Sequence, residues 1–134
     1  MATDHSHDMP KEVTTTSEEG FVMHNSMGDY ESTIDATGED GPDTLESLLA
    51  AYASCYVPAL RVAAEQRDAG DLGHIEIVAT GELNDDDKLA AISFDISTDA
   101  DLDDDQADAV VDRANALCKV HDAMKESLHA DVSL

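Results

Sequence analysis

The sequence predicts an α+β domain, and two observations support this fold class. Segments with strand-like and helix-like spacing of apolar residues follow one another in the order strands, long helix, hairpin, helix and strand. The chain has 134 residues, of which 42% are hydrophobic, which is enough to bury one core but leaves little room for a second unit. We therefore expect one folded domain, and the segments below justify each of its elements.

The first segment, residues 1–19, has no hydrophobic periodicity, so we expect a flexible arm followed by a domain over residues 20–134. His5 and His7 in this arm could in principle bind a metal ion, but two histidines in such a tail are more often incidental. Residues 21–25 and 30–37 then predict two short strands around a turn.

A long helix is predicted to begin at Asp43. Asp43 can accept a hydrogen bond at the helix start, and Glu46 three residues later can reach back, as in a capping box. Pro58 lies inside the helix and frees the carbonyl of Ser54, so we expect a kink beside Cys55 and an end near residues 69–70. The apolar residues at helical spacing are Leu45, Leu48, Leu49, Tyr52, Cys55, Tyr56 and Ala59.

The second half of the chain predicts a hairpin, a helix and a final strand. Alternation over residues 75–82 and again at 92–96, around an acidic turn, predicts the hairpin. Asp103 and Gln106 form another capping-box pattern. Apolar spacing continues from there through Cys118 to His121, which predicts one helix, and residues 129–134 alternate as a last strand.

The charge balance limits the possible functions. Thirty-one acidic residues against seven Lys and Arg give a formal charge of −24. Self-repulsion of this size is relieved in molar salt, where the Debye length is about 3 Å, so we favour a salt-rich cytoplasm over an acidic protein from an ordinary cell. The lack of a basic patch predicts no nucleic-acid partner. Without a long apolar run or a signal peptide, we also expect no membrane association.

The two cysteines suggest redox chemistry. Cys55 and Cys118 each lie on the apolar stripe of a predicted helix, which suggests a thiol pair brought together by folding in a reducing compartment. Two inert core cysteines are the alternative. Cys118 and His121 could also form half of a zinc site, but with only Cys55 as a third ligand we expect no metal and no cofactor. His121 is more often an ordinary histidine at a helix end.

Four segments carry a resemblance to a known family. They are residues 41–55 around Cys55, residues 81–83 (Gly-Glu-Leu), residues 101–106, and residues 114–121 around Cys118. Together they resemble the OsmC/Ohr family, the osmotically inducible protein C and organic hydroperoxide resistance proteins, over about residues 20–134.

The resemblance implies a swapped homodimer with thiol sites between its subunits. It implies that Cys55 attacks an organic hydroperoxide, that Cys118 resolves the product to a disulfide, and that a cellular dithiol reduces this disulfide. An apolar substrate pocket would favour organic hydroperoxides over hydrogen peroxide. We expect its lining to be Leu48, Leu49, Tyr52 and Tyr56.

Two departures from the family pattern concern activation of the thiol. The family's catalytic Glu lies ten residues before the reactive cysteine, where this chain has Leu45; Glu46 follows one residue later and serves equally well as a capping partner. The family's Arg from the N-terminal strands is missing, since the first Arg is Arg61, which is about 240° around the helix from Cys55. Candidate substitutes are Arg113, His24 and a group from the partner subunit.

These departures leave two functional hypotheses. The leading one is a thiol-dependent organic hydroperoxide reductase, and the competing one is a dimeric OsmC-fold protein that binds a small apolar or thiol-bearing ligand. Burial is expected to raise the pKa of Cys55, and its own helix dipole acts only within the terminal turns. Cys118 is followed by Lys119, where the family often has Pro, and has His121 within reach on the predicted helix.

Overall fold

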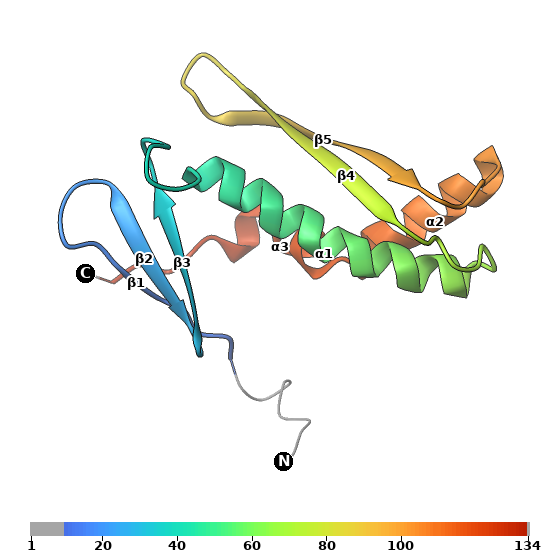
Figure 1. The fold of residues 1–134 in the computed structure, drawn as a ribbon, viewed down its shortest axis with the longest axis horizontal. Helices are drawn as coiled ribbons and strands as arrows, with labels where there is room; N and C mark the ends of the chain where they lie inside the picture. Colours follow the sequence, from blue (N-terminus) through green and yellow to red (C-terminus); the bar gives the residue numbers. More distant parts are fainter. Residues whose placement is uncertain (1–9, 134) are drawn as a thin grey trace. The chain divides into compact units, whose positions relative to one another are not determined.

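The computed structural model describes residues 10–133, so His5, His7 and the start of the predicted arm lie outside the described residues. Figure 1 shows the order of the elements along the chain. The chain divides into two compact units, one ending at Ser47 and the other beginning at Leu48. They are described separately. The elements are β1 (Thr14–Thr16), β2 (Val22–Met27), β3 (Tyr30–Asp35), α1 (Thr44–Gln66), β4 (Ile75–Leu83), β5 (Leu89–Thr98), α2 (Asp104–Leu117), α3 (Lys119–Ala123) and a 3₁₀ turn (Glu126–Leu128).

The first unit contains an antiparallel sheet in the order β1-β2-β3. Both predicted strands are confirmed, and Met27 pairs with Tyr30 at the turn between them. The strand β1 corrects the expectation of a flexible arm up to residue 19. Three consecutive threonines, Thr14–Thr16, pair with β2. Their β-branched side chains favour a strand without any apolar alternation, which is why the hydrophobic pattern did not reveal it. The domain start at residue 20 stays a prediction.

A buried carboxylate organises the loop after β3. Asp35 is 2% exposed and accepts hydrogen bonds from the Thr37 N–H at 2.9 Å, the Thr37 hydroxyl at 2.8 Å and the Asp40 N–H at 2.9 Å. The Asp40 N–H first, and the Thr37 hydroxyl and N–H next, hold the pKa of Asp35 below its ordinary value. Asp35 therefore fixes the conformation of the loop after β3 through these hydrogen bonds.

Helix α1 begins as the sequence predicts. Asp43 Oδ1 accepts the Glu46 N–H at 2.8 Å, and Glu46 Oε1 accepts the Asp43 N–H at 2.9 Å, which completes the capping box. The helix continues through Pro58 as one element and ends at Gln66, a few residues earlier than expected. Asp68 follows with a φ of 59°, a left-handed conformation that ends the helical path. The kink beside Cys55 stays a prediction.

Helix α1 also corrects the expectation that the chain has no long apolar run. By length and composition alone it could cross a membrane, with a mean hydropathy of 1.3 over its most apolar window. Such a test is weak evidence, because the core helix of a globular domain passes it too. Here the helix contributes much of the core of the second unit, through Tyr56, Ala59, Leu60, Ala63 and Ala64.

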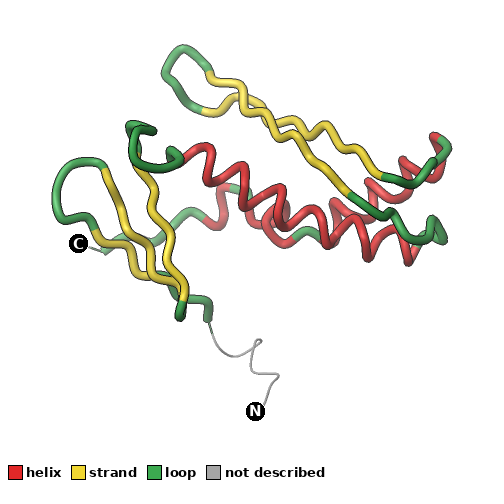
Figure 2. Tube along the Cα trace, in the orientation of Figure 1, coloured by secondary structure: helices red, strands yellow, loops and turns green. Residues whose placement is uncertain are grey.

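The core of the second unit lies between α1, the β4–β5 hairpin and α2. The hairpin lies along α1 in Figure 1, and Figure 2 shows the same strands and helices by type. The hairpin confirms the predicted strands, and its inner face packs Ile75, Ile77, Phe94 and Ile96 against the buried cluster. Gly81 in β4 lies close to two leucines, since a Cβ there would lie 2.6 Å from Leu89 Cδ2 and 3.3 Å from Leu49 Cδ1, so a larger residue would need these side chains to move. The buried residues are Tyr56, Ala59, Leu60, Ala63, Ala64, Leu72, Val110, Ala114 and Cys118.

The helix that was expected to run through Cys118 to His121 is in fact two helices. Helix α2 has the predicted Asp103–Gln106 capping box but ends at Leu117, and α3 begins at Lys119. Cys118 between them is extended, with φ −73° and ψ 115°. Its sulfur accepts the His121 N–H at 3.4 Å, so the residue caps the N-terminus of α3. Apolar spacing carries across the break, which is why periodicity alone predicted one helix.

The predicted final strand at residues 129–134 is wrong over its described part. Residues 129–133 are irregular and exposed, and no strand pairs with them within residues 10–133. The preceding residues Glu126–Leu128 form a 3₁₀ turn instead. Alternation by itself does not make a strand, because a strand also needs a hydrogen-bonding neighbour.

Candidate active site

Cys55 lies on α1 beside an apolar pocket. The thiol residue is half-buried, and the pocket has a volume of about 370 Å³. Pro58, Ala59 and Val62 follow Cys55 by three, four and seven residues, so they extend the same face of the helix. Leu117 and Lys119 complete the lining. An apolar molecule could therefore reach Cys55 next to a single ammonium group.

Cys118 lies in a different setting. It is 1% exposed and belongs to the buried core, where it connects α2 to α3. Both cysteines are free thiols in this structure. Cys55 packs against the buried cluster that contains Cys118, and each thiol affects the pKa of the other, so folding brings residues 63 positions apart into one region, as the sequence suggested.

The environment of Cys55 favours its thiolate. Burial alone would raise the pKa of the thiol, but hydrogen bonds from the Val120 N–H, the Cys118 thiol and the Lys119 N–H, with the Lys119 charge, lower it below the ordinary value. This corrects the expectation that burial dominates. The compensating groups lie on the first turn of α3, which a reading of α1 alone does not reveal.

The environment of Cys118 favours the neutral thiol. Burial raises its pKa, and the hydrogen bond and charge of Cys55 raise it further, against the lowering effect of the His121 and Val120 N–H groups. Of the two thiols, Cys55 therefore loses its proton first, and Cys118 keeps its proton to higher pH. A more acidic, accessible sulfur thus lies next to a more basic, enclosed one.

The expected substrate pocket is not the one that Cys55 lines. Leu48 is 37% exposed, and Leu49 lies against the hairpin near Gly81. Tyr52 and Tyr56 pack edge-on against Phe94, with ring centroids 4.7 and 5.3 Å from it. None of these four side chains lines the pocket beside Cys55, which is formed instead by Pro58, Ala59, Val62, Leu117 and Lys119.

The structure adds a contact that the sequence did not suggest. The Tyr52 hydroxyl is 2.5 Å from His121 Nδ1, which links α1 to α3. Burial, followed by the effect of Cys118, raises the pKa of Tyr52, so its hydroxyl keeps its proton and donates to Nδ1. Tyr52 and His121 share the lining of a separate pocket of about 450 Å³ with Met124. Tyr52 and His121 are 69 positions apart, so no local pattern in the sequence predicts that they are hydrogen-bonded.

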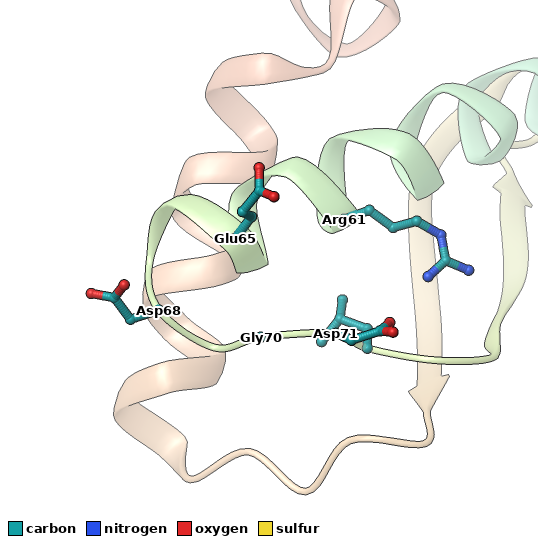
Figure 3. A pocket seen from close by; sticks show the side chains of 6 residues that line it. Arg61, Glu65, Asp68, Gly70 and Asp71 are labelled. Atoms are coloured by element: carbon teal, nitrogen blue, oxygen red, sulfur yellow. The ribbon is translucent and has the colours of Figure 1, made fainter.

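Neither a metal site nor a substitute for the missing Arg is found at Cys55 among the side chains of residues 10–133 that the sequence offered for these roles. Among residues 10–133, no group of three His, Cys, Asp or Glu side chains is arranged to hold a metal ion. The Arg113 Nε donates to Gln66 Oε1 at 2.6 Å, at the end of α1. Figure 3 shows Arg61 on another pocket, of about 600 Å³, with Glu65, Asp68 and Asp71; Cys55 does not line it. His24 is 3.3 Å from the Thr33 hydroxyl in the first unit.

Glu46 is committed to the capping box described above. Its carboxylate is therefore engaged at the start of the helix. A catalytic role for Glu46 stays a prediction.

An α+β unit built on a central cysteine helix, which packs against a buried cluster that contains a second cysteine, defines a class of protein. A family model described as OsmC-like protein matches residues 37–133, and the chain therefore belongs to the OsmC family. A protein of Haloferax volcanii with no assigned function is 42% identical over 123 residues, covering 92% of this chain and 93% of that protein.

Solved structures show the same fold. An OsmC-like protein from Mycoplasma pneumoniae is 17% identical, with 89% of each chain covered and a TM-score of 0.76. The organic hydroperoxide resistance protein OhrB of Bacillus subtilis is 22% identical, with 88% of this chain and 92% of that chain covered and a TM-score of 0.59. At these identities the likeness concerns the fold, which is α+β with antiparallel strands and a central helix.

Proposed function

We propose that this protein reduces organic hydroperoxides through Cys55 and Cys118. The observation that carries the proposal is the placement of the two thiols: Cys55 lines an apolar pocket and packs against the buried cluster that contains Cys118. The lowered pKa of Cys55 and the raised pKa of Cys118 support the same assignment of roles. The thiolate is the nucleophile in thiol chemistry, so the acidic sulfur beside the pocket is suited to attack. Membership of the OsmC family supports the same choice.

The reaction begins at the Cys55 thiolate. It attacks the terminal oxygen of the hydroperoxide, the O–O bond breaks, and the alkoxide leaves and takes up a proton to become the alcohol. Cys55 is then a sulfenic acid. The Cys118 sulfur gives up its proton and attacks Cys55 Sγ, which forms the disulfide and releases water. A cellular dithiol restores both thiols by exchange and is itself oxidised to a disulfide.

The groups that replace the missing Arg belong to α3. The Val120 and Lys119 N–H groups are fixed donors, and fixed donors stabilise an anion without reorganising during the reaction. The Lys119 charge adds to them. A thiolate can therefore form at Cys55 without any guanidinium from the N-terminal strands.

A second candidate is an OsmC-fold protein that binds a small apolar or thiol-bearing ligand. The observation that favours it is the lack of any Arg before Arg61, together with a Glu46 that is engaged in its capping box. The apolar pocket beside Cys55 would hold the ligand. Under this alternative Cys55 and Cys118 do not catalyse a reaction.

Turnover of cumene hydroperoxide with a dithiol reductant distinguishes the two candidates. The assay should be run in molar KCl with the thiols shown to be reduced. We expect consumption by the native protein and none above background by Cys55→Ser, because the hydroxyl of serine is not ionised at neutral pH. If the native protein consumes no more hydroperoxide than Cys55→Ser, the peroxidase proposal is wrong and the binding role is favoured.

We also propose that the protein acts as a homodimer in a salt-rich cytoplasm. The charge of −24 supports this setting, and residues 10–133 contain one ion pair, between Lys125 and Asp122 at 3.4 Å. A relative from Haloferax volcanii is consistent with it. A dimer carries twice this negative charge, so electrostatic repulsion destabilises it most at low ionic strength, where salt screens the charges least.

Sedimentation in molar and in about 0.05 M KCl tests the assembly, since the Debye length rises from about 3 Å to above 10 Å between them. We expect a dimer in molar salt that loosens or unfolds at low salt. A dimer that is equally stable in both solutions would contradict salt adaptation, and a monomer in molar salt would contradict the dimer.

A further inference from the structure

Helix α3 carries the donors that face Cys55, but it is a poor scaffold by itself. It has five residues, and isolated helices of that length are not stable in water. Lys119, His121, Asp122 and Ala123 are exposed, and only Val120 is half-buried. Something outside α3 must hold its first turn in place.

Helix α1 supplies that support through Tyr52. The Tyr52 hydroxyl is hydrogen-bonded to His121 Nδ1 at 2.5 Å. Tyr52 precedes Cys55 by three residues, so Tyr52 and Cys55 lie on one face of α1. The His121 N–H in turn binds the Cys118 sulfur at 3.4 Å. Helices α1 and α3 thus meet at two neighbouring points, the Tyr52–His121 hydrogen bond and the pocket that Cys55 and Lys119 line together.

The Tyr52 ring is itself fixed by packing. Its centroid lies 4.7 Å from that of Phe94 at 61°, and 6.5 Å from that of Tyr56 at 88°. Edge-to-face contacts of this kind restrict the ring to one orientation. The hydroxyl is therefore presented to His121 from a rigid position.

We propose that Tyr52 and His121 are positioning residues whose hydrogen bond holds the first turn of α3, with Lys119 on the pocket that Cys55 lines, in place beside the Cys55 thiol. Neither residue touches the reacting sulfur in this role. The inference rests on the proposed function for its chemical purpose, but the geometry that it describes exists in the resting protein.

The hydroxyl of Tyr52 can be removed without disturbing the aromatic cluster. In Tyr52→Phe the ring keeps its contacts with Phe94, and only the hydrogen bond to His121 is lost. Tyr56→Phe is the matched control, because Tyr56 belongs to the same cluster but donates to Asn115 on α2 at 2.7 Å. His121→Ala removes the link from the other side, and His121→Asn retains a side-chain acceptor.

The measurement is the rate of Cys55 alkylation by iodoacetamide across a pH series in molar KCl, read by peptide mass spectrometry. We expect Tyr52→Phe and His121→Ala to move the profile to higher pH and to slow alkylation at neutral pH about two- to tenfold, the effect of one lost hydrogen bond. Tyr56→Phe should match the native profile, and His121→Asn should lie closer to native than His121→Ala.

This readout needs no hydroperoxide, so it separates the two proposals. A native profile in both Tyr52→Phe and His121→Ala overturns the positioning role, even if the protein is an active peroxidase. An equal shift in Tyr56→Phe also overturns it, since the effect would then come from the aromatic cluster. A shift confined to Tyr52→Phe and His121→Ala supports the role, even in a protein that consumes no hydroperoxide.

Discussion

Cys55 and Cys118 are the same residue type in contact with each other, yet the structure treats them differently. Cys55 is half-buried within a continuous helix and opens onto a pocket, whereas Cys118 is buried at a break between two helices. The Val120 and Lys119 N–H groups and the Lys119 charge lower the pKa of Cys55, while burial and the neighbouring Cys55 raise the pKa of Cys118 against the opposing effect of the His121 and Val120 N–H groups. The difference shows that the break after Leu117 sets the chemistry of both thiols.

The break acts on both cysteines because it creates a new helix start. If α2 continued through His121, the Lys119 and Val120 N–H groups would bind carbonyls one turn earlier and would not be free for Cys55. Ending α2 at Leu117 frees these donors. It also turns Cys118 inward as the cap of α3, within reach of the first thiol.

The largest expected effect is on the fate of oxidised Cys55. One equivalent of cumene hydroperoxide should convert the native protein to an intramolecular Cys55–Cys118 disulfide, seen as the loss of two protons by non-reducing mass spectrometry. In Cys118→Ser the sulfenic acid at Cys55 has no resolving thiol, so it should persist and be trapped by dimedone. Free thiols, or disulfides formed only between molecules, would contradict a resolving role for Cys118.

A smaller effect is expected on the alkylation rate of Cys55 when the side chain of residue 118 can no longer donate a hydrogen bond to Cys55 or cap α3. Cys118→Ser retains a donor toward Cys55 and a side chain that caps α3, whereas Cys118→Ala loses both. Hydrogen bonds to charged groups contribute about 1.5–3 kcal/mol, so Cys55 in Cys118→Ala should be alkylated at least about tenfold more slowly at neutral pH than in Cys118→Ser. Equal rates in the two variants would show that the contact between the thiols does not stabilise the Cys55 thiolate.

The sign of the pH dependence follows from the lowered pKa of Cys55. Alkylation should increase as pH rises through the pKa of the folded protein, which lies below that of a free thiol. The same shift makes the folded state more stable above the ordinary thiol pKa, and this gain is lost as pH falls through the lowered value. If the pH profile of Cys55 alkylation is centred on the thiol pKa of the unfolded protein, the folded structure does not make Cys55 more acidic, and the proposed difference between Cys55 and Cys118 is wrong.

The sequence predicted the parts of this site that depend on local patterns. The capping boxes at Asp43 and Asp103, the hairpin, and the placement of Cys55 on a long apolar helix all follow from spacing within a few residues. That the two thiols meet was suggested by their positions on apolar stripes. The family likewise could be named from short motifs, and the match over residues 37–133 agrees with it.

The parts that the sequence did not predict depend on tertiary contacts. Apolar spacing from Ala114 through His121 is continuous, so nothing local marks the break at Cys118. The substrate pocket was expected on Leu48, Leu49, Tyr52 and Tyr56, whereas the pocket that Cys55 lines includes Leu117 and Lys119, which no local pattern joins to α1. The pKa of Cys55 was expected to rise because its compensating donors come from a helix 64 residues further along the chain.

The smallest expected effect concerns the Lys119 charge. Lys119 is exposed, and its ammonium is one of several groups that lower the pKa of Cys55. In Lys119→Gln the backbone donors remain, so Cys55 alkylation should slow less than about twofold in molar KCl, where the Debye length is about 3 Å. At about 0.1 M KCl the charge is screened less, and a two- to fivefold slowing is expected, equivalent to about 0.4–1 kcal/mol for an exposed pair.

Lys125→Gln is the control, since Lys125 pairs with Asp122 and is not among the groups that shift the pKa of Cys55. If Lys119→Gln slows alkylation tenfold or more in molar salt, the side-chain charge rather than the backbone of α3 sustains the thiolate, and the difference between the two cysteines would rest on one lysine.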